Sequence, residues 1–71
     1  MVRIEKGKFN GKRLYERRME LGLNLQDVAE RTGRHTTTVH DWEQAVSEPR
    51  APSLLQLSKA LKVEPAFYYQ P

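Results

Sequence analysis

The chain has 71 residues, a net charge of +3 and no cysteine. A chain of this length makes at most one domain with a small core, and it has no room for an enclosed catalytic cavity. Without cysteine, neither a disulfide framework nor a thiolate zinc site can support the core, which must therefore depend on helix packing.

Positive charge is concentrated at the N-terminal end. Residues 1–18 contain seven Lys/Arg against two Asp/Glu, a net charge of +5, whereas the rest of the chain carries −2. A basic end suits a polyanionic partner, although a solubilising surface explains the same charge equally well. No apolar run approaches the ~20 residues that span a bilayer. We therefore expect an unprocessed cytoplasmic protein with no membrane partner, associated with the nucleoid if the polyanion is DNA.

The first elements in chain order are an arm and a helix. Residues 1–10 have no helical period and are rich in lysine, which predicts a flexible basic arm. The folded domain is then expected over residues 11–71. Its first helix should begin near Gly11, bury Leu14, and end at Gly22.

The next two helices are separated by a tight turn. Asn24 is a good N-cap, and Asp27 three residues later completes a capping box, so a second helix is predicted over about 25–32. Gly33 closes it. A third helix is predicted over about 36–44.

The third helix has two distinct faces when its residues are placed at 100° intervals. Val39 and Trp42 fall on the side that should face the core, and Glu43 lies next to them. The opposite side is polar and should face outward; it comprises Thr36, Thr37, His40, Asp41 and Gln44.

Two further helices complete the predicted fold. Pro52 suits the first turn of a fourth helix that extends to about Lys62. Pro65 should start a short last helix in which Phe67 packs inward. The sequence therefore predicts an all-α protein, a bundle of five helices joined by short turns.

At this point the sequence resembles the Cro and phage-repressor family, also called the xenobiotic-response-element type of helix-turn-helix protein. The resemblance covers about residues 14–67. It rests on the joint spacing of Arg18, Gly22-Leu23-Asn24, Val28-Ala29-Glu30, Gly33, Val39, Trp42-Glu43, Glu48-Pro49 and Leu57-Ser58-Lys59-Ala60-Leu61-Lys62-Val63. It implies a lambda-repressor-like fold and a transcriptional regulator, which we expect to be a repressor.

The resemblance also implies that the third helix reads base edges in the major groove. The residues it places there are Thr36, Thr37, His40 and Asp41, on the face that helical geometry selects independently. A second implication is an ion pair between Arg18 and Glu43 that fixes the angle of this helix. An ordinary solvated helix face remains the alternative to base readout.

Phosphate contacts are expected from residues at helix starts and from exposed cations. The candidates by position are Gln26, Gln44, Arg50 and Ser53, and Arg34 is a weaker candidate. Lys6, Lys8 and Lys12 are weaker candidates. Such contacts hold the register on DNA without choosing a sequence.

One domain makes few phosphate contacts, so useful affinity calls for a homodimer on two half-sites of an operator. The expected dimer surface is the last helix with Phe67, Tyr68 and Tyr69. No cofactor, metal or small-molecule ligand is expected.

Three residues depart from the usual pattern of the family. Leu25 stands where Gln commonly contacts a phosphate, and Ala45 stands where Gly is usual, so a left-handed turn there would be strained. His35 replaces the usual Ser cap of the third helix. Thr36 is the alternative cap, which would remove it from base readout.

The alternatives to a DNA-binding regulator come from other functional classes. Catalysis has little support, because His35 and His40 are five residues apart and nothing places a nucleophile beside a base. A protein-interaction module is the serious alternative, since few Lys or Arg lie on the proposed reading face. The chain could also be the DNA-binding part of a longer regulator or antitoxin. RNA binding lacks an aromatic platform.

Overall fold

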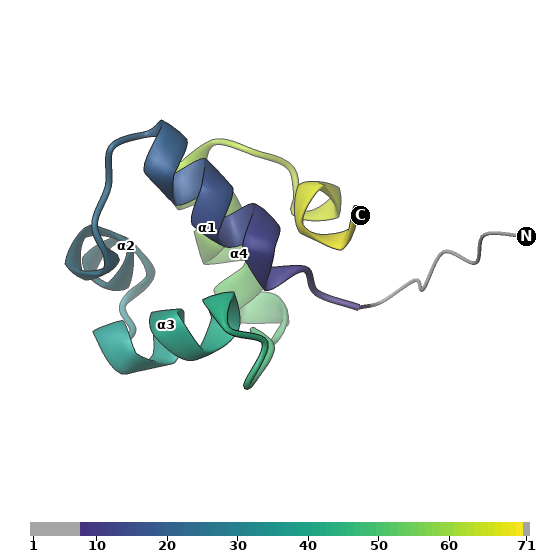
Figure 1. Ribbon diagram of the computed structural model, residues 1–71, viewed down its shortest axis with the longest axis horizontal. Coiled ribbons are helices and arrows are strands. Elements are labelled where there is room, and N and C mark those ends of the chain that lie inside the picture. Colours follow the sequence, from purple (N-terminus) through teal and green to yellow (C-terminus); the bar gives the residue numbers. More distant parts are fainter. Residues whose placement is uncertain (1–7, 71) are drawn as a thin grey trace, which may run out of the picture.

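The computed structural model describes residues 8–70, which fold into four α-helices and a C-terminal 3-10 helix (Figure 1). The order is α1 Gly11–Glu20, α2 Leu25–Thr32, α3 Thr36–Glu43, α4 Ala51–Leu61 and η1 Pro65–Tyr69. Within this range no helix is long and apolar enough to cross a membrane. The same residues contain no cluster of three or more His, Asp or Glu that could hold a metal ion.

The last element is not the α-helix that we expected. It has only five residues, opens on Pro65, and is held by a hydrogen bond from the Phe67 amide to the Glu64 carbonyl, 2.9 Å long and three residues apart. That spacing is the 3-10 pattern, which is usual for so short a helix. The all-helical class is therefore right, while the count of five α-helices is not.

The start and end of α1 follow from its flanking residues. The Asn10 side chain accepts a hydrogen bond from the Lys12 amide at 3.0 Å and so caps the first turn. At the other end Gly22 adopts φ +70°, and the Leu23 amide donates to the Arg18 carbonyl at 3.0 Å. This left-handed closure reverses the chain directly into α2.

The predicted capping box at the start of α2 is confirmed. The Asp27 amide donates to the Asn24 side chain at 2.8 Å, and the Asn24 amide donates to the Asp27 carboxylate at 2.9 Å. Gly33 ends α2 at φ +69°. The turn between α2 and α3 is therefore set by local chemistry, as the sequence predicts.

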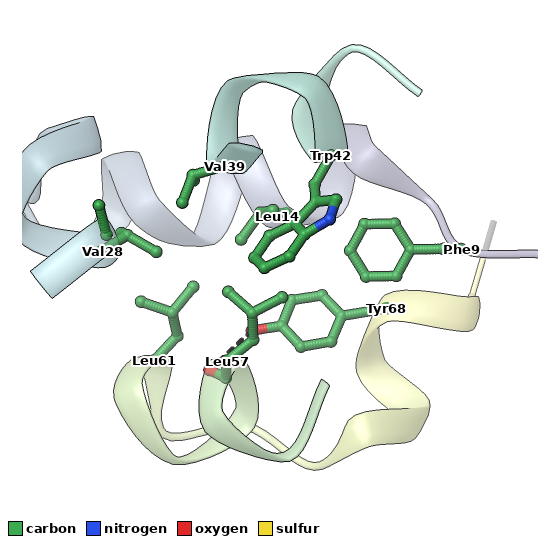
Figure 2. Close-up of a cluster of buried hydrophobic side chains, with 9 residues drawn as sticks. Phe9, Leu14, Val28, Val39, Trp42, Leu57, Leu61 and Tyr68 are labelled. Atoms are coloured by element: carbon green, nitrogen blue, oxygen red, sulfur yellow. Dashed lines mark hydrogen bonds between the residues drawn. The ribbon is translucent and has the colours of Figure 1, made fainter. Parts of the chain in front are cut away.

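The core gathers residues from every element (Figure 2). Phe9 and Tyr68 pack with ring centroids 5.4 Å apart, which joins the segment before α1 to η1. The buried apolar residues are Phe9, Leu14, Val28, Ala29, Val39, Trp42, Leu57, Leu61 and Tyr68.

The segment that we assigned to an arm contributes to this core. Phe9 is buried, and the Asn10 amide donates to the Tyr68 carbonyl at 2.7 Å. These two residues thus belong to the packed domain because they cover η1 and cap α1. Residues 1–7 of the expected arm lie outside the described residues.

Candidate nucleic-acid interface

The two faces of α3 differ sharply in burial. Val39 and Trp42 are 0% and 3% exposed and point into the core, as Figure 2 shows. On the other side Thr37, His40 and Gln44 are exposed. Helix α3 lies along one edge of the domain (Figure 1), and its polar side is the one exposed to solvent.

Two of the four candidate base-reading residues are only partly accessible. Thr36 and Asp41 are half-buried, whereas Thr37 and His40 are exposed. The N-cap of α3 is His35, with extended backbone at φ −82° and ψ 154° and no side-chain cap bond. Thr36 is the first helical residue, so the alternative that Thr36 caps this helix is wrong.

An ion pair joins α1 to the back of α3. The guanidinium of Arg18 donates to the Glu43 carboxylate from Nε at 2.6 Å and from Nη2 at 3.1 Å. A third hydrogen bond runs from Nη1 to the Leu23 carbonyl at 3.0 Å. The hydrogen bond and the negative charge of Glu43 raise the pKa of Arg18 above its usual value. Two buried charges therefore satisfy one another and orient α3 against α1.

A shallow hollow of about 180 Å³ lies between α3 and the start of α4. Two cations, Arg34 and Arg50, line it together with Thr38 and one acidic residue, Glu48. The side chain of Arg34 is held in place, because its Nε donates to Ser53 Oγ at 3.0 Å. The first turn of α4 adds the partial positive charge of a helix N-terminus at the same place. The hollow thus has two guanidinium groups and a helix N-terminus against a single carboxylate, a net positive environment.

The five candidate phosphate-binding residues differ in accessibility. Gln26, in the first turn of α2, is exposed and donates from Nε2 to Glu30 at 3.1 Å. Gln44 is exposed at the C-cap of α3. Ser53 is 4% exposed and accepts from Arg34, so its side chain positions an arginine and is not itself open to a ligand. Arg34 and Arg50 are exposed.

The three aromatic residues of η1 do not share one environment. Tyr68 is fully buried and its hydroxyl donates to the Leu57 carbonyl at 3.1 Å, so its side chain belongs to the core of its own protomer. Burial raises the pKa of this hydroxyl. Phe67 and Tyr69 are half-buried, and the Arg13 guanidinium lies 4.0 Å from the centre of the Phe67 ring. Only Phe67 and Tyr69 leave surface for a partner.

One feature of the site and one feature of the surrounding fold were missed by sequence reasoning. Thr38 lines the hollow beside the two arginines, although its place on the helical wheel lies between the two faces of α3. Lys62 adopts a left-handed conformation at φ 58° at the end of α4, where no glycine or asparagine signals it. By contrast, the left-handed Ala45 at φ 62° lies where the family pattern usually has glycine, as the resemblance implies.

Comparison with known proteins agrees with this geometry. The family model described as helix-turn-helix matches residues 14–68. The chain belongs to the helix-turn-helix family of the Cro and phage-repressor type. This is a family of DNA-binding regulators. The sequence has no significant match among curated proteins.

Solved structures of other proteins resemble this helix-turn-helix domain closely. The P22 c2 repressor in complex with a synthetic operator has a TM-score of 0.82 at 30% identity, covering 84% of this chain and 91% of that one. The restriction-modification controller protein C.AhdI from Aeromonas hydrophila has a TM-score of 0.79 at 29% identity, with coverages of 83% and 89%. The N-terminal DNA-binding domain of SinR from Bacillus subtilis, at 24% identity and a TM-score of 0.78, with coverages of 86% and 90%, shares the fold.

Proposed function

We propose that this domain binds a double-stranded DNA operator and represses transcription by occupying it. The observation that carries the proposal is the polar side of α3, which is open to solvent while Val39 and Trp42 hold the helix from behind. A helix of ordinary diameter fits the ~12 Å major groove of B-DNA. The P22 c2 repressor, which has the same fold at 30% identity, was solved in complex with an operator.

Base readout in this proposal comes from four residues of α3. Thr37 and His40 are exposed near the start and middle of the helix, where side chains reach base edges in helix-turn-helix proteins. A threonine hydroxyl bonds several bases and its methyl group contacts thymine, while histidine donates to guanine. Asp41 accepts from the amino group of cytosine, and Thr36 supports the contact at the start of the helix.

Phosphate binding is assigned to both sides of α3. Arg34 and Arg50 face the hollow beside the start of α4, and Ser53 keeps the Arg34 side chain in place. Gln26 at the start of α2 and Gln44 at the end of α3 are exposed on their helices. These contacts set the position of the domain on the duplex, whereas the bases decide the sequence.

A homodimer is part of the proposal, because one domain of this size makes too few phosphate contacts for tight binding. The surface available for it is Phe67 and Tyr69 of η1, with Tyr68 supporting them from the core. Two such domains would place their α3 helices on half-sites about one helical turn apart.

The test is duplex binding measured against salt concentration. Selection from random duplexes should yield a two-fold symmetric site, and log K for that site should fall linearly with log salt because phosphate contacts release counterions. An unselected duplex of the same length is the control. Absence of binding at low salt, in a protein that is folded by circular dichroism, contradicts the proposal.

A protein-interaction module is the second candidate function, because no Lys or Arg lies on α3 itself. The salt series separates the two. A module that binds a protein partner leaves duplex DNA unbound at every salt concentration, whereas the DNA reader binds it in a salt-dependent way.

A further inference from the structure

Gly11 is buried at the start of α1 although its backbone does not demand glycine. Among the described glycines only Gly22 and Gly33 have positive φ. Glycine in a helix costs stability relative to alanine, because it loses more backbone freedom on folding. The missing side chain at Gly11 therefore has to be explained by what packs against it.

The end of α3 lies directly against Gly11. A Cβ atom at this position would lie 2.6 Å from the Glu43 carbonyl oxygen, and the Trp42 carbonyl oxygen would be closer still. Real Cβ atoms essentially never approach other atoms that closely. Both oxygens belong to the backbone, so neither can turn aside as a side chain does. Helices α1 and α3 thus meet at a distance that only glycine permits.

The same face of α1 makes a second contact with α3. The buried residues of α1 are Gly11, Leu14 and Arg18, three and four positions apart, which places them on one side of the helix. Arg18 binds the carboxylate of Glu43, and Gly11 lies against the backbone of that same residue. Helix α1 therefore holds the C-terminal end of α3, whereas the N-terminal end of α3 follows the turn at Gly33.

The start of α1 is itself fastened on its other side. The Asn10 amide donates to the Tyr68 carbonyl at 2.7 Å, and the Asn10 side chain donates to the Gln70 carbonyl at 2.9 Å. The guanidinium of Arg13 adds a hydrogen bond to the Phe67 carbonyl at 3.2 Å. Because η1 restrains α1 in this way, we expect the strain from an added side chain at Gly11 to fall on the contact with the end of α3.

We propose that Gly11 is a positioning residue for the reading helix. By allowing the close approach of α1, it sets how the C-terminal half of α3 lies, and with it the placement of His40, Asp41 and Gln44 on DNA. Thr36 and Thr37 at the other end are set independently by the turn from α2. This inference rests on the proposed function only where it concerns DNA.

The test is Gly11→Ala in a Lys62→Gly background. Relieving the left-handed Lys62, at φ 58° on α4, adds stability away from α3, so the variant has a margin for staying folded. Backbone amide chemical shifts of residues 41–45 should move relative to the Lys62→Gly parent, and those of Thr36 and Thr37 should stay. In selection from random duplexes, base preference at the positions read by His40 and Asp41 should change by about fivefold or more, the lower end of what one good base contact discriminates.

The matched control is Leu61→Val in the same background, which shortens a buried side chain on α4 by one methylene group and changes no residue of α1 or α3. It should lower stability and leave base preference unchanged at every position. Unmoved amide shifts at 41–45 in Gly11→Ala, equal changes at both ends of α3, or failure to fold even in the stabilised background would each overturn the inference.

The two readouts separate this inference from the proposed function. If the parent selects no DNA sequence, the proposed function fails, and the amide shifts still decide whether Gly11 places the end of α3. The other case is a parent that selects a site and a Gly11→Ala variant that moves the amide shifts without altering base preference. The positioning role of Gly11 in DNA reading then fails, whereas the proposed function stands.

Discussion

The side chain of Glu43 is 2% exposed and its carboxylate is bound by Arg18, whose own side chain is 10% exposed. This pair crosses from α1 to α3 behind the reading face, so it fixes how α3 is presented. Removing one partner would leave the other charge buried without compensation. We expect Glu43→Gln to lower the free energy of unfolding by about 3–5 kcal/mol, measured by urea denaturation.

The surface pair of Arg17 and Glu20 provides the matched control. Glu20 has 65% of its side chain exposed and lies 3.1 Å from the Arg17 guanidinium. Glu20→Gln should therefore cost no more than about 1 kcal/mol. Equal losses for Glu43→Gln and Glu20→Gln would show that the pair between α1 and α3 does not hold the domain together.

Replacing Ala45 with glycine should stabilise the domain. The Ala45 backbone has φ 62°, in the left-handed region, where a Cβ is disfavoured and glycine is not. Ala45→Gly should raise the free energy of unfolding by about 0.5–1 kcal/mol, because relief of strain exceeds the added freedom of the unfolded chain. Ala66→Gly, an exposed residue of η1 without positive φ, is the control and should be neutral or destabilising. A loss at Ala45 would contradict the assigned backbone strain.

The buried hydroxyl of Tyr68 should make the domain less stable at high pH. Burial raises the pKa of this hydroxyl in the folded state, whereas in the unfolded chain it titrates near the usual value of about 10. Below that pH both states are protonated and nothing is lost. Above it the unfolded state releases the proton first, so the free energy of unfolding should fall by up to about 1.4 kcal/mol per pH unit.

Urea denaturation at a series of pH values from about 8 to about 11 measures this effect. Tyr68→Phe should flatten the alkaline decline, at the cost of about 0.5–1.5 kcal/mol for the hydrogen bond to the Leu57 carbonyl. Tyr15→Phe makes the same change on an exposed tyrosine of α1 and should leave the decline as it is. A decline that persists unchanged in Tyr68→Phe would assign it to another group.

Thr37 and Asp41 should decide the DNA sequence that is bound. Thr37→Ala and Asp41→Ala are each expected to relax preference at one base position by about 1–3 kcal/mol, measured by selection from random duplexes. Glu16→Ala is the control, because it also removes one carboxylate but does so on α1, away from α3. It should leave the selected sequence unaltered. Selection of the parental site by both α3 variants would remove these residues from base readout.

Arg34 and Arg50 should act on affinity without acting on sequence. Replacing either with Ala should weaken binding to all duplexes alike and lower the slope of log K against log salt by about 1, as loss of one phosphate contact requires. Lys59→Ala, an exposed cation near the far end of α4, is the control and should keep the slope. A shift in the selected sequence for Arg34→Ala would point to base contact instead.

Local chemistry made the order and the boundaries of most helices predictable. Glycines at positions 22 and 33 close helices with positive φ, and the capping box of Asn24 and Asp27 opens α2, because each feature depends on residues within a few positions of one another. The same holds for the two faces of α3, since helical periodicity alone puts Val39 and Trp42 together.

Contacts between distant parts of the chain were less accessible to sequence reasoning. Phe9 was assigned to an arm because no period surrounds it, yet it is buried against Tyr68 of η1. Tyr68 was expected at a dimer surface, yet its hydroxyl is used by the Leu57 carbonyl inside the protomer. Ser53 was expected to face phosphate, yet it holds Arg34. The environment of each of these residues depends on which side chain or backbone group of another element packs against it.

The amino-acid sequence by itself therefore determined the helix class, the turn between α2 and α3, and the polar strip of α3, because caps, glycine stops and periodicity act over a few residues. Only the tertiary structure decided how close the helices come. The meeting of Gly11 with the carbonyl groups of Trp42 and Glu43 involves residues more than thirty positions apart. No local pattern records that distance, since it is set by the packing of all the side chains between α1 and α3.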